Sequence, residues 1–222
     1  MRFILLALML LASSFSANAE DADFPIRADD GSVIANHRIP AALESQIGTL
    51  PGIVVVGNPK GDVTLFEFYD LNCPFCRRAA ADLKDIVAKD KALKLVLVPF
   101  PVLGFGSIQG GRVEIAVAAM VSPQRFFDFH HKVYASRGMI DGAKALAAAK
   151  AIGLDPVKVT VAADDDKIAG ILTAHLRVGD ALGIAATPGI VIGGVTIVGY
   201  PGRKAIEGVI AAVRRCGQVV CA

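Results

Sequence analysis

Two cysteines two residues apart, Cys73-Pro74-Phe75-Cys76, stand where a hydrophobic strand gives way to a helix. At this spacing they can close a disulfide within one helical turn. The first thiol then meets unpaired backbone N–H groups and the positive end of the helix dipole, and both favour the thiolate. The preceding run Val63–Tyr69 is β-branched and aromatic, as is typical of a buried strand. The combination predicts a thiol–disulfide redox site.

The first residues have the three parts of a secretory signal. Arg2 precedes an apolar run over residues 3–12, and small residues follow, ending in Ala17-Asn18-Ala19. The alternative is a membrane anchor, but a spanning helix needs about 20 apolar residues, and this run breaks at Ser13. We therefore expect a cleaved signal peptide over residues 1–19 and no permanent membrane anchor.

Charge and cysteine usage narrow the class further. The formal net charge is +2, and cleavage before Glu20 would remove one positive charge. A nearly neutral protein has no electrostatic reason to bind nucleic acid or an anionic membrane surface. All four cysteines follow the predicted signal, which fits a compartment where disulfides persist. We expect the bacterial periplasm.

Hydrophobic periodicity predicts a strand–helix–strand unit, a helical block, a hairpin and a last helix. The turn pair Gly193-Gly194 marks the hairpin. The predicted strands are 53–56, 63–69, 95–98, 190–192 and 195–198, and the predicted helices are 40–47, 113–120, 123–135, 143–152, 168–182, 202–215 and one from Pro74 onward. Phe75, Ala79, Leu83 and Ile86 form the apolar stripe expected on that helix.

This order is similar to the thioredoxin fold, and the helical block resembles the insertion of the DsbA family of secreted thiol oxidoreductases. The resemblance covers Gly57 to Arg215. Its motifs are Phe66-Glu67-Phe68, Cys73-Pro74-Phe75-Cys76 and Thr187-Pro188 directly before the hairpin. It implies an α/β thioredoxin fold with an inserted helical subdomain.

The resemblance also implies a division of the chain. We expect a signal peptide (1–19), an N-terminal lead-in (20–51), a first thioredoxin half with the CxxC motif (52–106), an inserted helical subdomain (107–184), a second thioredoxin half (185–216) and a C-terminal tail (217–222).

We expect Cys73, at the exposed helix start, to be the nucleophile, and Cys76, one turn in, to be buried and to resolve the mixed disulfide. The dipeptide Pro74-Phe75 would tune the pKa of the thiol. One alternative is a purely structural disulfide. Another is a four-cysteine zinc site completed by Cys216 and Cys221, although zinc sites usually have a short CxxC knuckle in both halves.

Three further residues have predicted roles beside the cysteines. Glu67 would be a buried carboxyl near Cys76 that handles its proton; the alternative is a glutamate on an edge or at the surface. The resemblance makes Pro188 a cis-proline facing the CxxC motif, with the backbone of Thr187 offered to an extended substrate. An ordinary turn is the alternative there.

The last two cysteines, Cys216 and Cys221, lie just past the last predicted helix. We interpret them as a structural disulfide that closes the tail, with a second redox pair as the alternative. His130 and His131 lie on a predicted helix and are interpreted as core or surface residues rather than ligands. We expect no metal and no cofactor.

The predicted function is a periplasmic thiol:disulfide oxidoreductase that donates disulfides to secreted proteins through Cys73. Its partners would be reduced or misoxidised secreted proteins and a membrane redox partner, either a DsbB-like oxidant or a DsbD-like reductant. Well-known oxidising members have His in the dipeptide, where this chain has Phe75. A disulfide isomerase or reductase kept reduced by a membrane partner is therefore the alternative, followed by a metal-binding or chaperone module.

Overall fold

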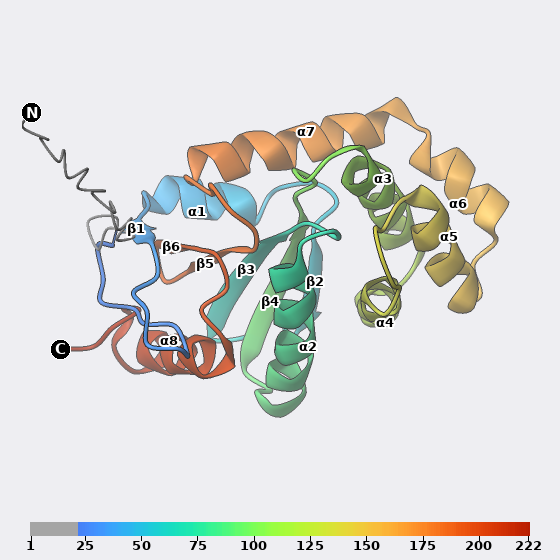
Figure 1. Cartoon of the computed structure of the whole chain (residues 1–222). Helices are drawn as coiled ribbons and strands as arrows, with labels where there is room; N and C mark the ends of the chain where they lie inside the picture. Colours follow the sequence, from blue (N-terminus) through green and yellow to red (C-terminus); the bar gives the residue numbers. More distant parts are fainter. Residues whose placement is uncertain (1–21) are drawn as a thin grey trace, which may run out of the picture.

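The strand before the cysteines lies inside a mixed sheet (Figure 1). The computed structural model describes residues 22–222, so the predicted signal peptide lies outside the described residues. Within them, six strands follow the order β1-β6-β5-β3-β4-β2. Only β3 and β4 run parallel. The strands are β1 (Asn36–Arg38), β2 (Val54–Gly57), β3 (Val63–Tyr69), β4 (Leu93–Pro99), β5 (Gly189–Ile192) and β6 (Val195–Val198).

Helices cover both faces of this sheet (Figure 1). Residues 22–222 contain α1 (Ala41–Ile47), α2 (Pro74–Lys89), α3 (Phe105–Met120), α4 (Pro123–Tyr134), α5 (Gly142–Ala151), α6 (Pro156–Ala163), α7 (Asp166–Ala181) and α8 (Arg203–Cys216). Helices α2 and α8 lie on one face, and α1 and α7 lie on the other. Helices α3 to α6 pack together beside the sheet, at the end of the molecule away from the C-terminus.

The alternation of side chains along β3 divides the core in two. Leu65 and Tyr69 belong to the core under α2 and α8, whereas Phe66 and Phe68 point to the core under α1 and α7. Glu67 is on the same face as Leu65 and Tyr69, so its carboxyl points toward the CxxC helix. The predicted thioredoxin fold with a helical insertion is confirmed.

Two helices differ from their predicted bounds for reasons visible in the sequence. Helix α3 starts at Phe105, eight residues before the predicted start, because glycines with low helix propensity hide its first half. Gly110 is needed there, since a Cβ atom would lie 2.8 Å from the Leu71 side chain. Helix α6 was not predicted because its valines and threonine favour strands.

The lead-in, predicted as residues 20–51, is part of the fold. Its strand β1 pairs with β6, with Asn36 opposite Ile197. The Asn36 side chain is fully buried. Its amide donates to the Phe24 carbonyl at 2.9 Å and accepts from the Phe24 N–H at 3.0 Å. Three polar residues have no periodic pattern, so this strand could not be predicted. No helix among residues 22–222 is long and apolar enough to cross a membrane.

Candidate active site at the start of helix α2

Cys73 caps the N-terminus of α2. It has extended backbone angles, and Pro74 is the first helical residue, where its missing N–H costs no hydrogen bond. The Cys73 Sγ accepts a hydrogen bond from the backbone N–H of Cys76 at 3.4 Å. The Cys73 N–H donates to the carbonyl of Asp70 at 3.1 Å, which closes the turn before the helix. A sulfur in this position faces the unpaired N–H groups of the first helical turn.

Both sulfurs are buried, which corrects the expectation of an exposed Cys73. Cys73 is 4% exposed and Cys76 is fully buried. The loop before β5 covers Cys73, and the thiol donates to the carbonyl oxygen of Thr187 at 3.1 Å. The Thr187–Pro188 peptide bond is cis. The structure therefore brings the two cysteines and the two predicted substrate-binding residues into one cluster.

The two thiols have opposite acidities. The pKa of Cys73 falls to about 6, mainly because the Cys76 thiol donates a hydrogen bond to it. The Thr187 side chain and the N–H groups of Cys76 and Phe75 lower this pKa further, against the effect of burial. Burial and the neighbouring Cys73 raise the pKa of Cys76 far above its ordinary range. Cys73 is therefore the thiol of the pair that ionises below neutral pH, while Cys76 keeps its proton.

Glu67 lies beneath the pair on β3 and is 1% exposed. Its neighbours across the sheet are Leu97 and Ile190, and neither carboxyl oxygen has a hydrogen-bond partner. Burial raises its pKa to about 8, with smaller contributions from Cys73 and Glu114. Glu67 is therefore mostly protonated at neutral pH. With a pKa this close to neutral, its carboxyl can donate a proton to a neighbouring group and take it back.

A second buried polar group stands behind Glu67. The Glu114 carboxyl of α3 contacts the Nδ1 atom of His130 on α4 at 3.1 Å, and both residues are 1% exposed. The His130 ring packs edge-on against Tyr69 and Tyr134, with centroids 4.7 and 4.8 Å apart. Burial raises the pKa of Glu114 and lowers that of His130 to about 3, so His130 is neutral at pH 7.

Asp70 and Asn72 form a hydrogen-bond cluster immediately before Cys73. The buried Asp70 carboxylate accepts from four groups: the N–H of Val102, the N–H of Leu103, the N–H of Asn72 and the Ser107 hydroxyl, at 2.7 or 2.8 Å. The Asn72 amide donates to the Ser107 hydroxyl and to the carbonyl of Ile140, and it accepts from the N–H of Ile140. In the sequence, the only sign of this cluster is that Asp70 and Asn72 are short polar residues next to the cysteines.

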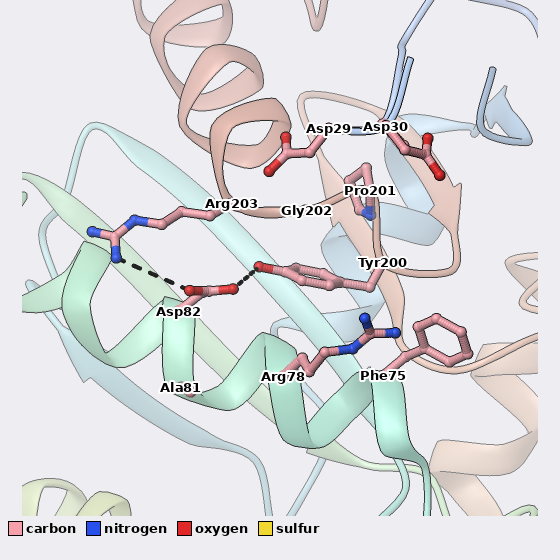
Figure 2. A pocket seen from close by; sticks show the side chains of 11 residues that line it. Asp29, Asp30, Phe75, Arg78, Ala81, Asp82, Tyr200, Pro201, Gly202 and Arg203 are labelled. Carbon is pink, nitrogen blue, oxygen red and sulfur yellow. Dashed lines mark hydrogen bonds and ion pairs between the residues drawn. The ribbon is translucent and has the colours of Figure 1, made fainter. Parts of the chain in front are cut away.

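Phe75 lies outside the apolar stripe predicted for α2, because it is 48% exposed. The buried stripe uses Cys76 in its place. The Arg78 guanidinium lies over the Phe75 ring at 4.5 Å. Both line a groove of about 580 Å³ between α2 and the segment that leads into α8 (Figure 2). On the far side, the Tyr200 hydroxyl donates to Asp82 at 2.8 Å.

The other predicted pair, Cys216 and Cys221, forms a disulfide across the end of α8, with the sulfurs 2.04 Å apart. Between them Val219 is buried in the core. The two pairs do not converge on one centre, and residues 22–222 contain no group of three or more potential metal ligands. His175 is also buried, and its two ring nitrogens bond the carbonyls of Pro99 and Pro51.

Fold and site together define the class: a thiol–disulfide oxidoreductase in which an acidic thiol, a buried partner thiol and a cis-proline meet at a helix start. The family model described as thioredoxin matches residues 49–212, and the chain belongs to this family. The block of helices between β4 and β5 lies at the place in the chain where the resemblance to the DsbA family predicts an insertion.

Solved structures agree with this assignment. A thioredoxin-like oxidoreductase from Silicibacter pomeroyi is 28% identical, with a TM-score of 0.69 over 75% of this chain and 94% of its own. Two others share the fold at 24% identity. A periplasmic thioredoxin-like protein from Salmonella enterica has a TM-score of 0.70, covering 80% and 99% of the two chains. The thiol-disulfide exchange protein alpha-DsbA2 from Wolbachia pipientis has 0.68, covering 78% and 94%. No curated protein matches the chain.

Proposed function

We propose that this oxidoreductase is a periplasmic dithiol oxidase that donates the Cys73–Cys76 disulfide to secreted proteins. The observation that carries the proposal is the place of Cys73 at the N-terminus of α2, where its sulfur accepts from the Cys76 N–H; the Cys76 thiol and this position lower its pKa to about 6. Stabilising the thiolate stabilises the reduced form of the enzyme, and this makes the disulfide a stronger oxidant.

The reaction has two exchange steps. A client thiolate attacks the Cys73 sulfur, the Cys73–Cys76 bond breaks, and its electron pair passes to Cys76. A second client thiolate then attacks the client sulfur of the mixed disulfide. The client disulfide forms, Cys73 leaves as a thiolate, and two electrons have moved from the client to the enzyme.

Glu67 supplies the proton that the first step needs. Cys76 leaves as a thiolate in a buried site that disfavours its charge, and the protonated Glu67 carboxyl lies on the same side of the sheet. Transfer of that proton gives a neutral Cys76 thiol and a Glu67 carboxylate. During reoxidation by the membrane partner, the carboxylate takes the proton back.

The client would bind over the start of α2, next to the buried Cys73 sulfur. The Thr187–Pro188 turn, just before β5, contacts the Cys73 sulfur, and the groove begins at Phe75, two residues after Cys73. The exposed Phe75 ring and Arg78 offer an apolar face with a charged edge to a chain lying along the groove (Figure 2). We place Thr187 and Pro188 on the client side of the site.

A disulfide isomerase or reductase, kept reduced by a membrane partner, is the second candidate. It is favoured by Phe75, which offers the thiolate neither charge nor hydrogen bond through its side chain. Against it, isomerases generally need a segment for dimer formation. In this chain the lead-in is used within the fold, where β1 pairs with β6 and α1 packs on the sheet.

Secretion to the periplasm rests on the N-terminal sequence. N-terminal sequencing of the exported protein is expected to find a start near Glu20. A protein that keeps residues 1–19 would contradict cleavage.

The deciding experiment is the reduction potential of the Cys73–Cys76 pair in glutathione buffers, with Cys216 and Cys221 changed to Ala. An oxidase is expected well above about −200 mV, toward about −120 mV. A value near or below about −200 mV would favour the isomerase or reductase. Absence of a reversible couple would contradict both.

A further inference from the structure

The three residues before Cys73 all bind the helical insertion and the loop that leads into it. Asp70 fixes the β4–α3 loop through the N–H groups of Val102 and Leu103, each at 2.8 Å. Leu71 packs on α3 at Gly110, where an added Cβ atom would lie 2.8 Å from the Leu71 side chain. Asn72 fixes the α4–α5 loop at Ile140. Its amide accepts from the Ile140 N–H at 2.6 Å and donates to the Ile140 carbonyl at 2.8 Å.

The helical subdomain and the nucleophile therefore meet in one hydrogen-bond cluster. Ser107, near the start of α3, joins its two halves by donating to Asp70 at 2.7 Å and accepting from Asn72 at 2.9 Å. The Tyr134 hydroxyl of α4 adds a bond to the Asp70 carbonyl at 3.1 Å. Asp70 and Ser107 are each 1% exposed, and every polar atom of their side chains has a partner. A fully satisfied buried network of this kind specifies one geometry.

This geometry matters because the direction in which the chain enters α2 sets the position of the Cys73 sulfur. The sulfur must lie over the first turn to accept from the Cys76 N–H and must also reach the Thr187 carbonyl across the site. Only three residues, Asp70, Leu71 and Asn72, connect the end of β3 to Cys73. We propose that Asp70 and Asn72 are positioning residues through which the helical insertion sets the place of the Cys73 sulfur, an inference that rests on Cys73 being the attacking thiol.

A substitution of Asn72 removes none of the groups that face Cys73 directly. They are Glu67 from β3, Cys76 from α2 and the Thr187 turn from the segment before β5. Asn72 itself carries no charge. A change in the acidity of Cys73 after substitution of Asn72 would thus report the position of the sulfur and not the loss of a charge.

The test uses the reduced full-length chain with Cys216 and Cys221 changed to Ala, so that only the site titrates. The rate of alkylation by iodoacetamide is measured against pH. The parent should have a midpoint near the pKa of about 6. In Asn72→Ala we expect this midpoint to rise by about one unit, which lowers the rate at pH 6 roughly fivefold.

Asn58→Ala is the matched control. Asn58 is also half-buried and bonds backbone groups, the Lys91 carbonyl and the Lys60 N–H, but in the turn before β3. We expect it to keep the parent midpoint. Ser107→Ala, which removes one hydroxyl from the cluster, should give a smaller upward shift and keeps the test open if Asn72→Ala does not fold.

The outcomes separate the inference from the function beneath it. If Asn72→Ala and Ser107→Ala keep the parent midpoint and only lower the melting temperature, the two residues are structural and the inference is wrong. If the parent itself has no midpoint below about 8, the thiolate argument for the oxidase fails instead.

Discussion

The two cysteine pairs stand at opposite ends of helices and behave as opposites. Cys73 caps the start of α2, where N–H groups surround the sulfur. Cys216 is the last residue of α8, and its sulfur lies 3.2 Å from the carbonyl oxygen of Ala212. A helix start stabilises a thiolate, whereas a helix end with its carbonyl oxygens repels one.

The two pairs also differ in solvent exposure, and the difference is the opposite of what a reactive pair would suggest. The pair at the start of α2 is buried, and the pair at the end of α8 is partly exposed. Exposure alone would assign the redox chemistry to the wrong pair. The local field at the sulfur, and the buried Glu67 carboxyl beneath it, are the features that support our proposal of Cys73 and Cys76 as the redox pair.

The largest effect is expected from removing the nucleophile. Cys73→Ser leaves no sulfur at the helix start, so catalysed oxidation of a reduced client protein should fall to the uncatalysed rate. The double variant with Cys216 and Cys221 changed to Ser should keep the parent rate. Stopped-flow or gel-based measurement of client oxidation checks both. An equal loss of client oxidation in the two variants would contradict the assignment of the redox chemistry to the pair at the start of α2.

The next effect concerns the proton partner. Glu67→Gln removes the acid that protonates Cys76, and general acids contribute about 10²–10⁴ to such steps. We expect mixed-disulfide formation to slow by roughly a hundredfold at pH 7. In the parent the rate per client thiolate should decline as pH rises through about 8, where Glu67 loses its proton. Glu114→Gln, an equally buried carboxyl change, is the control and should retain this decline.

The acidity of the two pairs gives a smaller but sharper comparison. In the fully reduced protein, thiolate absorbance at 240 nm should rise first near pH 6, from Cys73 alone. Cys216 and Cys221 should give a separate rise at higher pH, because both sulfurs lie against the carbonyl oxygen of Ala212 near the helix end. Single-cysteine variants assign each rise. A tail thiol that titrates near 6 would contradict the assignment by helix position.

The smallest effect is on stability. Closing a loop between Cys216 and Cys221, five residues apart, contributes about 2 kcal/mol in the chain-entropy model. Changing both to Ala should therefore lower the melting temperature by about 4–8 °C for a domain of this size. Thermal unfolding followed by circular dichroism measures this. No change would mean that the buried Val219 holds the tail without the disulfide.

The sequence was sufficient wherever local chemistry and local structure agree. Val63–Tyr69 reads as a strand and Cys73-Pro74 as a helix start, and both are found within a residue of their predicted bounds. Asp155-Pro156 is an equally good helix start for α6, but the valines after it outweighed that signal. There, packing in the insertion overrides strand propensity.

The supporting residues of the site were beyond prediction for a different reason. Asp70 and Asn72 bind Val102, Leu103 and Ile140, about 30 to 70 residues away. Nothing in a pattern of apolar residues encodes such pairings. The burial of Cys73 was missed likewise, because the segment that covers it, at Thr187, lies 114 residues further along the chain.

The strand order also governs how this chain can fold. The central strand β3 lies between β4, which follows soon after it, and β5, which follows only after the whole helical insertion. At the far edge, β1 from the beginning of the described chain pairs with β6 near its end. One side of β3 therefore stays uncovered until nearly all the chain is available for folding. Contacts so distant in sequence make folding slow, and the unfinished edge is then open to other strands.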